Sequence, residues 1–422
     1  MAKYSIAIVG AGPSGYFAAQ ALQNLETEDL KFSIDLIERL PTPWGLVRSG
    51  VAPDHPKIKS VSKVFEKVAT AGNVSLFGNV EVGSDISLEE LKAKYDAVIL
   101  AIGTSIGKKL GIPGEELPNS LSAADFVPWY NGHPDYVNIK LDLTSDTAIV
   151  IGAGNVAMDC ARMLALEPSE LDATDTAEHA ISELKRSNIR KVYICARRGA
   201  EFAAFTSPEL RELPELEHTN VIINKQEIMA ALTRVGDQPD KHVKSNLDAM
   251  LNIASNDNHP HERSMEFLFQ HVPVSINGSS KVESVTFKTP DGERTLNCGL
   301  VISAIGYQPK PTEGLTIDGS KLTNIDGHID SNLYVVGWAK RGPSGVIGTN
   351  KSDAAEVVNK LVEQLPTTPK TKFDLAALLD AKIVTQPIWE KINQAEIAAG
   401  EPLGKPRLKA VSREELFGLG NV

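Results

Sequence analysis

Two glycine-rich motifs constrain the fold of this chain more than any other feature of its 422 residues. Each follows a short apolar run, 5–9 and 148–151, of the kind that forms a parallel strand covered on both faces. The first motif spans residues 10–15 (GAGPSG) and the second spans 152–157 (GAGNVA), and a helical stretch follows each. Because a strand, such a turn and a helix begin a dinucleotide-binding fold, the sequence predicts two Rossmann-like domains.

The spacing of small residues in each motif has a physical reason. Gly10 permits the tight turn, Gly12 lets the backbone approach a pyrophosphate, and Gly15 lets the helix pack close to the strand. Gly152 and Gly154 repeat the first two roles in the second motif, whose third position is the permitted alanine. The helix that follows offers backbone N–H groups and a partial positive charge to the phosphates.

The residues after the second strand of each domain differ in charge. Glu38 ends the second strand of the first domain, where a carboxylate can accept hydrogen bonds from ribose hydroxyls. Arg197 and Arg198 follow the corresponding strand of the second domain. A planar guanidinium pairs with phosphate, whereas an acid there would repel a 2′-phosphate. This contrast predicts that the first domain binds the adenosine of FAD and the second binds NADP.

Composition excludes several other classes of protein. The three cysteines, Cys160, Cys195 and Cys298, are widely spaced, so a disulfide scaffold, a cysteine-ligated metal or cluster and a dithiol active site are excluded, and no metal is expected. The formal net charge of −11 argues against nucleic-acid binding. No apolar run approaches the roughly 18 residues of a transmembrane helix, and we expect a reducing compartment.

Longer motifs resemble the adrenodoxin reductase family of NADPH-dependent ferredoxin reductases. The most specific are PWGLVR at 43–48, GVAPDHP at 50–56 and GWAKRGPSGVIGT at 337–349. The resemblance covers nearly the whole chain and extends to GKPR at 404–407. It implies an NADP domain inserted into a discontinuous FAD domain. The expected boundaries are 1–104 for the first FAD part, 105–331 for the NADP domain, and 332–422 for the second FAD part with a helical tail.

The resemblance also implies roles for matching positions. Ser14, with Glu38, is expected at the ADP half of FAD, and Leu46 and Val82 at the flavin site. The isoalloxazine is expected to contact Trp338, Gly345, Val346 and Ile347. The NADP pyrophosphate is expected to contact Gly152, Gly154, Asn155 and Val156. Glu209 is expected to lie beside the bound nucleotide.

Three polar residues are candidates for a proton relay near the flavin. They are His55, Asp159 and Glu212, since releasing electrons singly from reduced flavin also sheds a proton. A structural role stays open for each, because His55 lies in a proline-flanked turn and Asp159 can pair locally on its helix. Arg211 matches a basic position on the expected partner surface. Residues 238–246 depart from the family, because they contain Lys241, His242 and Lys244 where relatives that dock acidic ferredoxins tend to be richer in arginine.

The sequence therefore predicts an FAD-dependent NADPH:ferredoxin oxidoreductase acting on an iron–sulfur partner, as a monomer. It passes hydride from NADPH to flavin N5 and then single electrons to a ferredoxin. The compartment expected is the bacterial cytoplasm, or the mitochondrial matrix for a processed chain. Alternatives are the NADPH-oxidising subunit type of glutamate synthases, a flavin monooxygenase, and a redox-inactive binding protein. One departure is Glu201, an acid close to the predicted 2′-phosphate site, where the family often has Pro-Leu-Gln.

Overall fold

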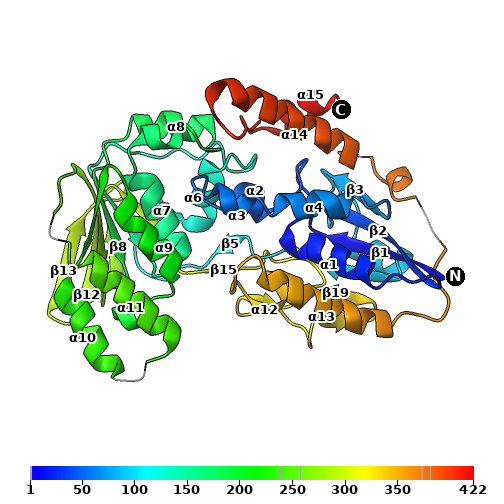
Figure 1. Ribbon diagram of the computed structural model, residues 1–422, viewed down its shortest axis with the longest axis horizontal. Coiled ribbons are helices and arrows are strands. Elements are labelled where there is room, and N and C mark those ends of the chain that lie inside the picture. The colour runs from blue at the N-terminus through cyan, green and yellow to red at the C-terminus, as the bar shows by residue number, and fades with distance from the viewer. Residues whose placement is uncertain (1, 237–238, 257, 372–373, 381) are drawn as a thin grey trace. The chain divides into compact units, whose positions relative to one another are not determined.

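The computed structural model describes residues 2–236, 239–256, 258–371, 374–380 and 382–422, and it divides into two compact units. The first unit contains residues 1–106 and 307–422, and the second contains residues 107–306. Figure 1 labels their helices and strands. The chain crosses from one unit to the other at two short strands, β5 (Ile106–Gly107) and β15 (Tyr307–Gln308).

A six-stranded sheet forms the centre of the first unit. Its strands lie in the order β18-β19-β4-β1-β2-β3, and all neighbours are parallel except β18 and β19. The strands are β1 (Ala2–Val9), β2 (Leu30–Glu38), β3 (Val74–Gly78), β4 (Ala97–Leu100), β18 (His328–Asp330) and β19 (Leu333–Val335). Ile6 of β1 is paired with Ile34 of β2, and both are fully buried, as expected for a sheet covered on both faces.

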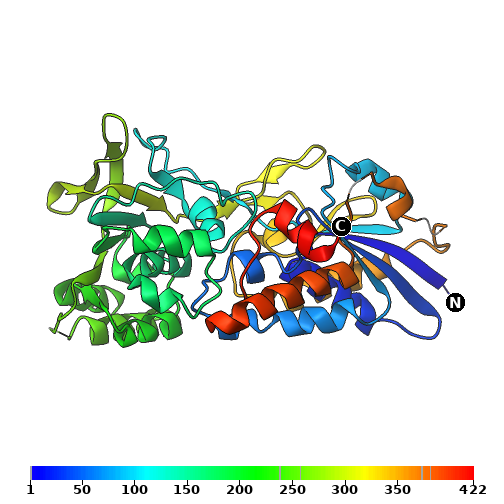
Figure 2. The same ribbon diagram turned by 90° about the horizontal axis from the view of Figure 1, so that it is seen from above.

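Helices cover this sheet, and α1 (Pro13–Asn24) packs beside α13 (Thr349–Glu363) although they are far apart in sequence (Figure 1). Figure 2 shows α14 (Gln386–Gly400) lying along α15 (Arg413–Gly420) near the C-terminus. The remaining elements are α2 (Leu46–Ser49), α3 (Pro56–Lys59), α4 (Ser62–Ala69), α5 (Leu88–Lys94), α12 (Trp338–Arg341), β16 (Ile317–Asp318), β17 (Lys321–Leu322), and the 3-10 turns Ala376–Leu378 and Glu401–Leu403.

The second unit has its own six-stranded sheet, in which every neighbouring pair is parallel. The order is β6-β14-β7-β8-β10-β9. These strands are β6 (Ser120–Ser122), β7 (Thr147–Ile151), β8 (Lys191–Cys195), β9 (Thr219–Ile223), β10 (Arg263–Leu268) and β14 (Leu300–Ser303). The second unit also contains a three-stranded antiparallel sheet of β11 (Val272–Asn277), β12 (Ser284–Thr289) and β13 (Gly292–Asn297).

The helices of the second unit include α10 (Lys225–Val235) and α11 (Lys241–Ile253), which lie side by side (Figure 1). The others are α6 (Ala123–Tyr130), α7 (Asn155–Ala165), α8 (Glu178–Lys185), α9 (Ser207–Glu212), and the 3-10 turns Pro168–Leu171, Ala200–Phe202 and Leu213–Glu215. Apolar side chains of α7 and its neighbours form a continuous core, with Met158, Leu164 and Ile302 almost completely buried. The two-domain α/β architecture predicted from the motifs is confirmed.

The second crossing between the units lies at residues 306–307, whereas the sequence places it at 331–332. Residues 307–331 belong to the first unit for a structural reason. Strand β18 in this stretch pairs with β19 of the first sheet, and β17 packs against α12. None of the helices in the described part of the chain has the length and apolar character that crossing a bilayer requires.

Candidate functional site

The first glycine motif forms the turn between β1 and α1. Gly10 has a φ of +110°, and a Cβ at this position would lie 2.5 Å from the carbonyl oxygen of Ala101. A Cβ on Gly15 would collide with the carbonyl of Gly10. The backbone at both positions therefore requires glycine, and the close approach of α1 to β1 that the sequence predicts is present.

The N-terminus of α1 fits a pyrophosphate. Gly12 is the N-cap in an extended conformation, and no side chain caps the helix. A Cβ on Gly12 would have no neighbour closer than 3.8 Å, the Cα of Gly45, so the backbone surface is open. Uncapped N–H groups and the positive end of the helix dipole are the groups that bind phosphate oxygens.

Glu38 lies at the end of β2 beside this turn and is buried. Its Oε2 accepts a hydrogen bond from the N–H of Ala11 at 3.0 Å, and its Oε1 accepts one from Leu40 at 3.1 Å. Burial raises the pKa of Glu38, although these two hydrogen bonds oppose the shift. Each carboxylate oxygen keeps a second lone pair, so Glu38 can hold the turn and also accept from a ribose hydroxyl.

The PWGLVR segment packs against the first glycine motif. The N–H of Trp44 donates to the carbonyl of Ala11 at 2.7 Å, and Trp44 has a φ of +84°. A positive φ is costly for a tryptophan and needs support from its surroundings. Trp389 of α14 packs edge-on against its ring at 5.0 Å, and the guanidinium of Arg407 lies over it at 5.3 Å. Leu46, expected at the flavin, follows Gly45 and is 44% exposed.

The second flavin-site segment, the loop after β19, begins at α12. Trp338 is half-buried, its Nε1 donates to the carbonyl of Ser344 at 3.2 Å, and its ring stacks on Tyr307 at 6.1 Å. Gly345 has a φ of +80°, Val346 is 66% exposed, and Ile347 packs against the core. The exposed glycine backbone leaves this loop open to a planar ring, as the resemblance implies.

A hydrogen bond joins this loop to the first glycine motif. The hydroxyl of Ser14 on α1 donates to Oδ1 of Asn350 on α13 at 3.0 Å. Asn350 also accepts from Arg341 at 2.9 Å. Asn350 carries no signal in the sequence, because no local pattern pairs two residues that lie 336 positions apart. Val82, the last predicted flavin-site residue, bridges to Ile86 beyond the end of β3 and packs on the core of the first unit.

The second glycine motif forms the turn between β7 and α7 in the second unit. A Cβ on Gly152 would lie 2.5 Å from the carbonyl oxygen of Ala304, and Gly154 is the N-cap of α7 with no side-chain cap. Asn155 opens α7 and accepts from the N–H of Thr206 at 2.9 Å, while its Nδ2 donates to the Thr206 hydroxyl at 3.2 Å. Val156 packs against the core beneath.

Arg197 and Arg198 lie two and three residues beyond the end of β8, and both are exposed. Within the described residues neither guanidinium forms an ion pair, although Arg198 lies over the ring of Phe202 at 4.9 Å. Two unpaired guanidinium groups at the carboxyl end of a parallel strand fit a phosphate monoester. Glu38, the acid at the matching place in the first unit, would repel such a phosphate.

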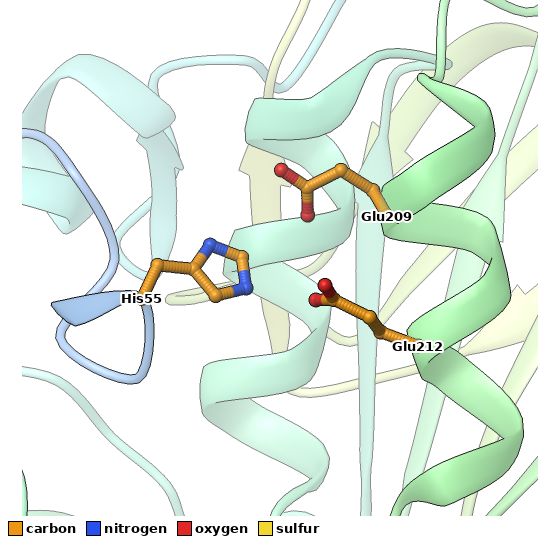
Figure 3. Close-up of side chains that lie close together, drawn as sticks. All are labelled: His55, Glu209 and Glu212. Atoms are coloured by element: carbon orange, nitrogen blue, oxygen red, sulfur yellow. The ribbon is translucent and has the colours of Figure 1, made fainter. Parts of the chain in front are cut away.

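The three predicted relay residues are distributed over both units. His55 belongs to the first unit and is the N-cap of α3, half-buried, with no side-chain cap bond. Asp159 on α7 pairs with Arg162 one turn later at 2.8 Å, the local pairing that the sequence leaves open. Figure 3 shows Glu209 and Glu212 on α9, where both side chains extend from the same side of the helix.

The three cysteines are free and buried, and they lie in the cores of the second unit. Burial raises the pKa of all three thiols, that of Cys298 to about 12. A thiol of this kind is not a nucleophile, so none of them forms a dithiol redox centre.

Comparisons with known proteins show the family to which the chain belongs. Residues 4–223 match the family described as pyridine nucleotide-disulphide oxidoreductase. The chain is 43% identical to the NADPH-ferredoxin reductase FprA of Mycobacterium tuberculosis, covering all of both proteins. It is 35% identical to the human mitochondrial NADPH:adrenodoxin oxidoreductase, over 98% of this chain and 91% of that one. The solved structure of M. tuberculosis FprA in complex with NADPH matches with a TM-score of 0.95 at 42% identity, covering both chains fully.

Proposed function

Because the chain belongs to the pyridine nucleotide-disulphide oxidoreductases, and among them to the NADPH-ferredoxin and adrenodoxin reductases, we propose that it passes electrons from NADPH through FAD to a ferredoxin. The family resemblance predicted from the motifs is confirmed. The iron–sulfur partner is a ferredoxin of the adrenodoxin type, and the enzyme acts as a monomer. Light scattering on the purified protein tests the last statement.

One observation supports this function most strongly, namely the difference between the two nucleotide sites. Each glycine motif precedes a helix with no side-chain cap. An acid, Glu38, lies beside the first motif, whereas two cations, Arg197 and Arg198, follow β8 in the unit that contains the second motif. A chain with one site for FAD and another for NADPH is built for hydride transfer between them. The buried, unreactive cysteines exclude a dithiol as the acceptor of these electrons.

FAD, when bound, accepts two electrons as hydride from NADPH and releases them singly to the iron–sulfur partner. The chain's own residues bind and orient the two nucleotides. The N-terminus of α1 and Glu38 hold the adenosine diphosphate half of FAD, while α7 and the two arginines hold that of NADPH. In this proposal residues 44–46 and 345–347 would contact the flavin, and the backbone has a positive φ at Trp44 and at Gly345.

Proton movement is assigned to His55, Asp159 and Glu212. In this proposal His55 and Glu212 are the side chains that pass the proton. Asp159 pairs with Arg162 at 2.8 Å, so its part in this proposal is to orient and stabilise a neighbouring positive charge. Substitution His55→Gln tests the relay, because it slows the proton-coupled step and leaves NADPH binding unchanged.

Docking of an acidic ferredoxin is assigned to a basic surface on α9 and α11, which pack together. Arg211, Lys241 and Lys244 are exposed there, and Arg211 is steadied by a hydrogen bond to Ser245 at 3.2 Å. A local basic surface attracts an acidic partner despite the net charge of −11.

The test of this function is spectroscopic. The purified protein should contain FAD, NADPH should bleach it in a stopped-flow mixer much faster than NADH, and cytochrome c reduction should require an added [2Fe–2S] ferredoxin. Arg197→Ala with Arg198→Ala should lower kcat/KM for NADPH about tenfold or more, since charge-assisted hydrogen bonds are lost, and leave NADH unchanged. A colourless protein that takes up no FAD, or equal effects on both nucleotides, would contradict the proposal.

A further inference from the structure

An acid lies in the loop where the 2′-phosphate of NADPH is expected. Glu201 is in the 3-10 turn Ala200–Phe202, three residues after Arg198. Its side chain is 8% exposed, so its carboxylate is largely shielded from water. An uncompensated carboxylate so placed would repel a phosphate dianion and oppose the preference that the two arginines create.

Arg234 neutralises this acid. Its Nε donates to Oε1 of Glu201 at 2.6 Å and its Nη2 donates to Oε2 at 2.9 Å, a two-point contact between the planar groups. The hydrogen bonds from Arg234 hold the pKa of Glu201 below its ordinary value, so the acid is ionised at neutral pH and needs a counter-charge. Arg234 is 42% exposed and lies in the last turn of α10, whose buried Ile228 and Ala231 fix the helix.

The ion pair lies directly against the arginine segment. A Cβ on Gly199, the residue after Arg198, would lie 2.9 Å from Nη2 of Arg234 and would collide with Oε2 of Glu201. Gly199 therefore allows the pair to contact the backbone next to Arg198. Arg198 itself stacks on Phe202, the residue after Glu201.

We propose that Arg234 determines the preference for NADPH by cancelling the charge of Glu201, so that Arg197 and Arg198 face the 2′-phosphate unopposed. This inference rests on the proposed function and adds to it a residue that acts through another side chain. The side chains of Arg197, Arg198, Glu201 and Arg234 together carry a net charge of plus two. Without the charge of Arg234 the net charge is plus one. Removing Glu201 together with Arg234 returns the sum to two.

The test measures nucleotide binding without flavin reduction. Calorimetry on the full-length holoprotein compares 2′,5′-ADP, which carries the 2′-phosphate, with 5′-AMP, which lacks it. Arg234→Gln should weaken 2′,5′-ADP about tenfold, a change of about 1.4 kcal/mol, and leave 5′-AMP unchanged. The double variant, Arg234→Gln with Glu201→Gln, should bind 2′,5′-ADP within about threefold of the unaltered protein. Glu201→Gln alone leaves three positive charges and should bind 2′,5′-ADP at least as tightly as the unaltered protein.

Controls separate this inference from the function on which it rests. Lys225→Gln removes an exposed cation from the other end of α10 and should change neither nucleotide. If Arg234→Gln has no effect, or weakens 2′,5′-ADP equally with Glu201 present or absent, the inference is overturned while the NADP site stands. If the unaltered protein itself fails to distinguish 2′,5′-ADP from 5′-AMP, the NADP assignment and the inference both fall.

Discussion

At the scale of single residues, a buried ion pair supports the first cofactor site. Glu396 of α14 accepts from Arg48 at 2.6 and 2.8 Å and from the N–H of Ala410 at 2.9 Å, and its side chain is fully buried. Arg48 ends the PWGLVR segment and also lies over the ring of Trp389 at 5.6 Å. The tail of the chain therefore holds the segment that presents Trp44 and Leu46.

We expect Glu396→Gln to lower the free energy of unfolding by about 3–5 kcal/mol, because it leaves the buried charge of Arg48 uncompensated. Glu390→Gln makes the same chemical change at an exposed position of α14, and it should change the free energy of unfolding by less than about 0.5 kcal/mol. Urea denaturation at pH 7 measures both. Equal losses would mean that the pair contributes nothing beyond helix propensity.

The same pair gives stability a defined pH dependence. Burial alone would raise the pKa of Glu396, but the charge of Arg48 and its hydrogen bonds outweigh burial and hold the pKa below its ordinary value. A carboxyl with a lowered folded pKa contributes its full stability above its unfolded pKa, about 4.3, and loses it as pH falls through the folded value. The difference in melting temperature between the unaltered protein and Glu396→Gln should therefore shrink between pH 7 and pH 3.5. A constant difference would contradict this origin of the stability.

The flavin-site loop allows a sharper test at one glycine. Gly345→Ala places a Cβ at a φ of +80° and 2.8 Å from Oγ1 of Thr349, so the loop must shift. We expect flavin reduction by NADPH in a stopped-flow mixer to slow by about tenfold, since small displacements of reacting groups are costly. Gly348→Ala is the matched control, because its φ is −60° and a Cβ there meets nothing within 4 Å. Similar slowing in both variants would argue against a positioning role.

At the scale of elements, the sequence predicts what depends on local pattern and misses what depends on long-range contacts. Runs of apolar residues place β1 and β7 to within a few residues, because strands covered on both faces carry no polar alternation. The motifs place the starts of α1 and α7 equally well. The contacts Ser14–Asn350, Arg48–Glu396 and Glu201–Arg234 join distant segments, and no local signal marks them.

Asn155 links two elements of the second nucleotide site and carries an element-scale prediction. Its side chain ties the start of α7 to Thr206, the N-cap of α9. Asn155→Ala should free residues 204–206 and lower the free energy of unfolding by about 1–2 kcal/mol, the sum of two modest hydrogen bonds. Hydrogen exchange of the peptide covering 203–210 should speed up, and Asn252→Ala, an exposed change on α11, should leave it unchanged. Unaltered exchange in Asn155→Ala would show that the link is not what orders the segment.

At the scale of the whole molecule, the second unit is one uninterrupted stretch of chain with its own core. Its two ends meet, because the N–H of Lys108 donates to the carbonyl of Gly306 at 3.0 Å. Its parallel sheet and the core residues beneath α7 all come from residues 107–306. A stretch of this size with adjacent ends and a separate core meets the usual conditions for independent folding.

We therefore expect a fragment of residues 107–306 to fold alone and to bind 2′,5′-ADP in preference to 5′-AMP. Its affinity should be within about threefold of the full chain, because both arginines, the second glycine motif and the Glu201–Arg234 pair lie inside it. Cooperative thermal unfolding by circular dichroism checks the folding, and calorimetry checks the binding. The same fragment carrying Arg197→Ala and Arg198→Ala should fold equally well and should no longer prefer 2′,5′-ADP to 5′-AMP. A fragment that folds but binds both nucleotides alike would mean that the 2′-phosphate is recognised by residues outside the second unit.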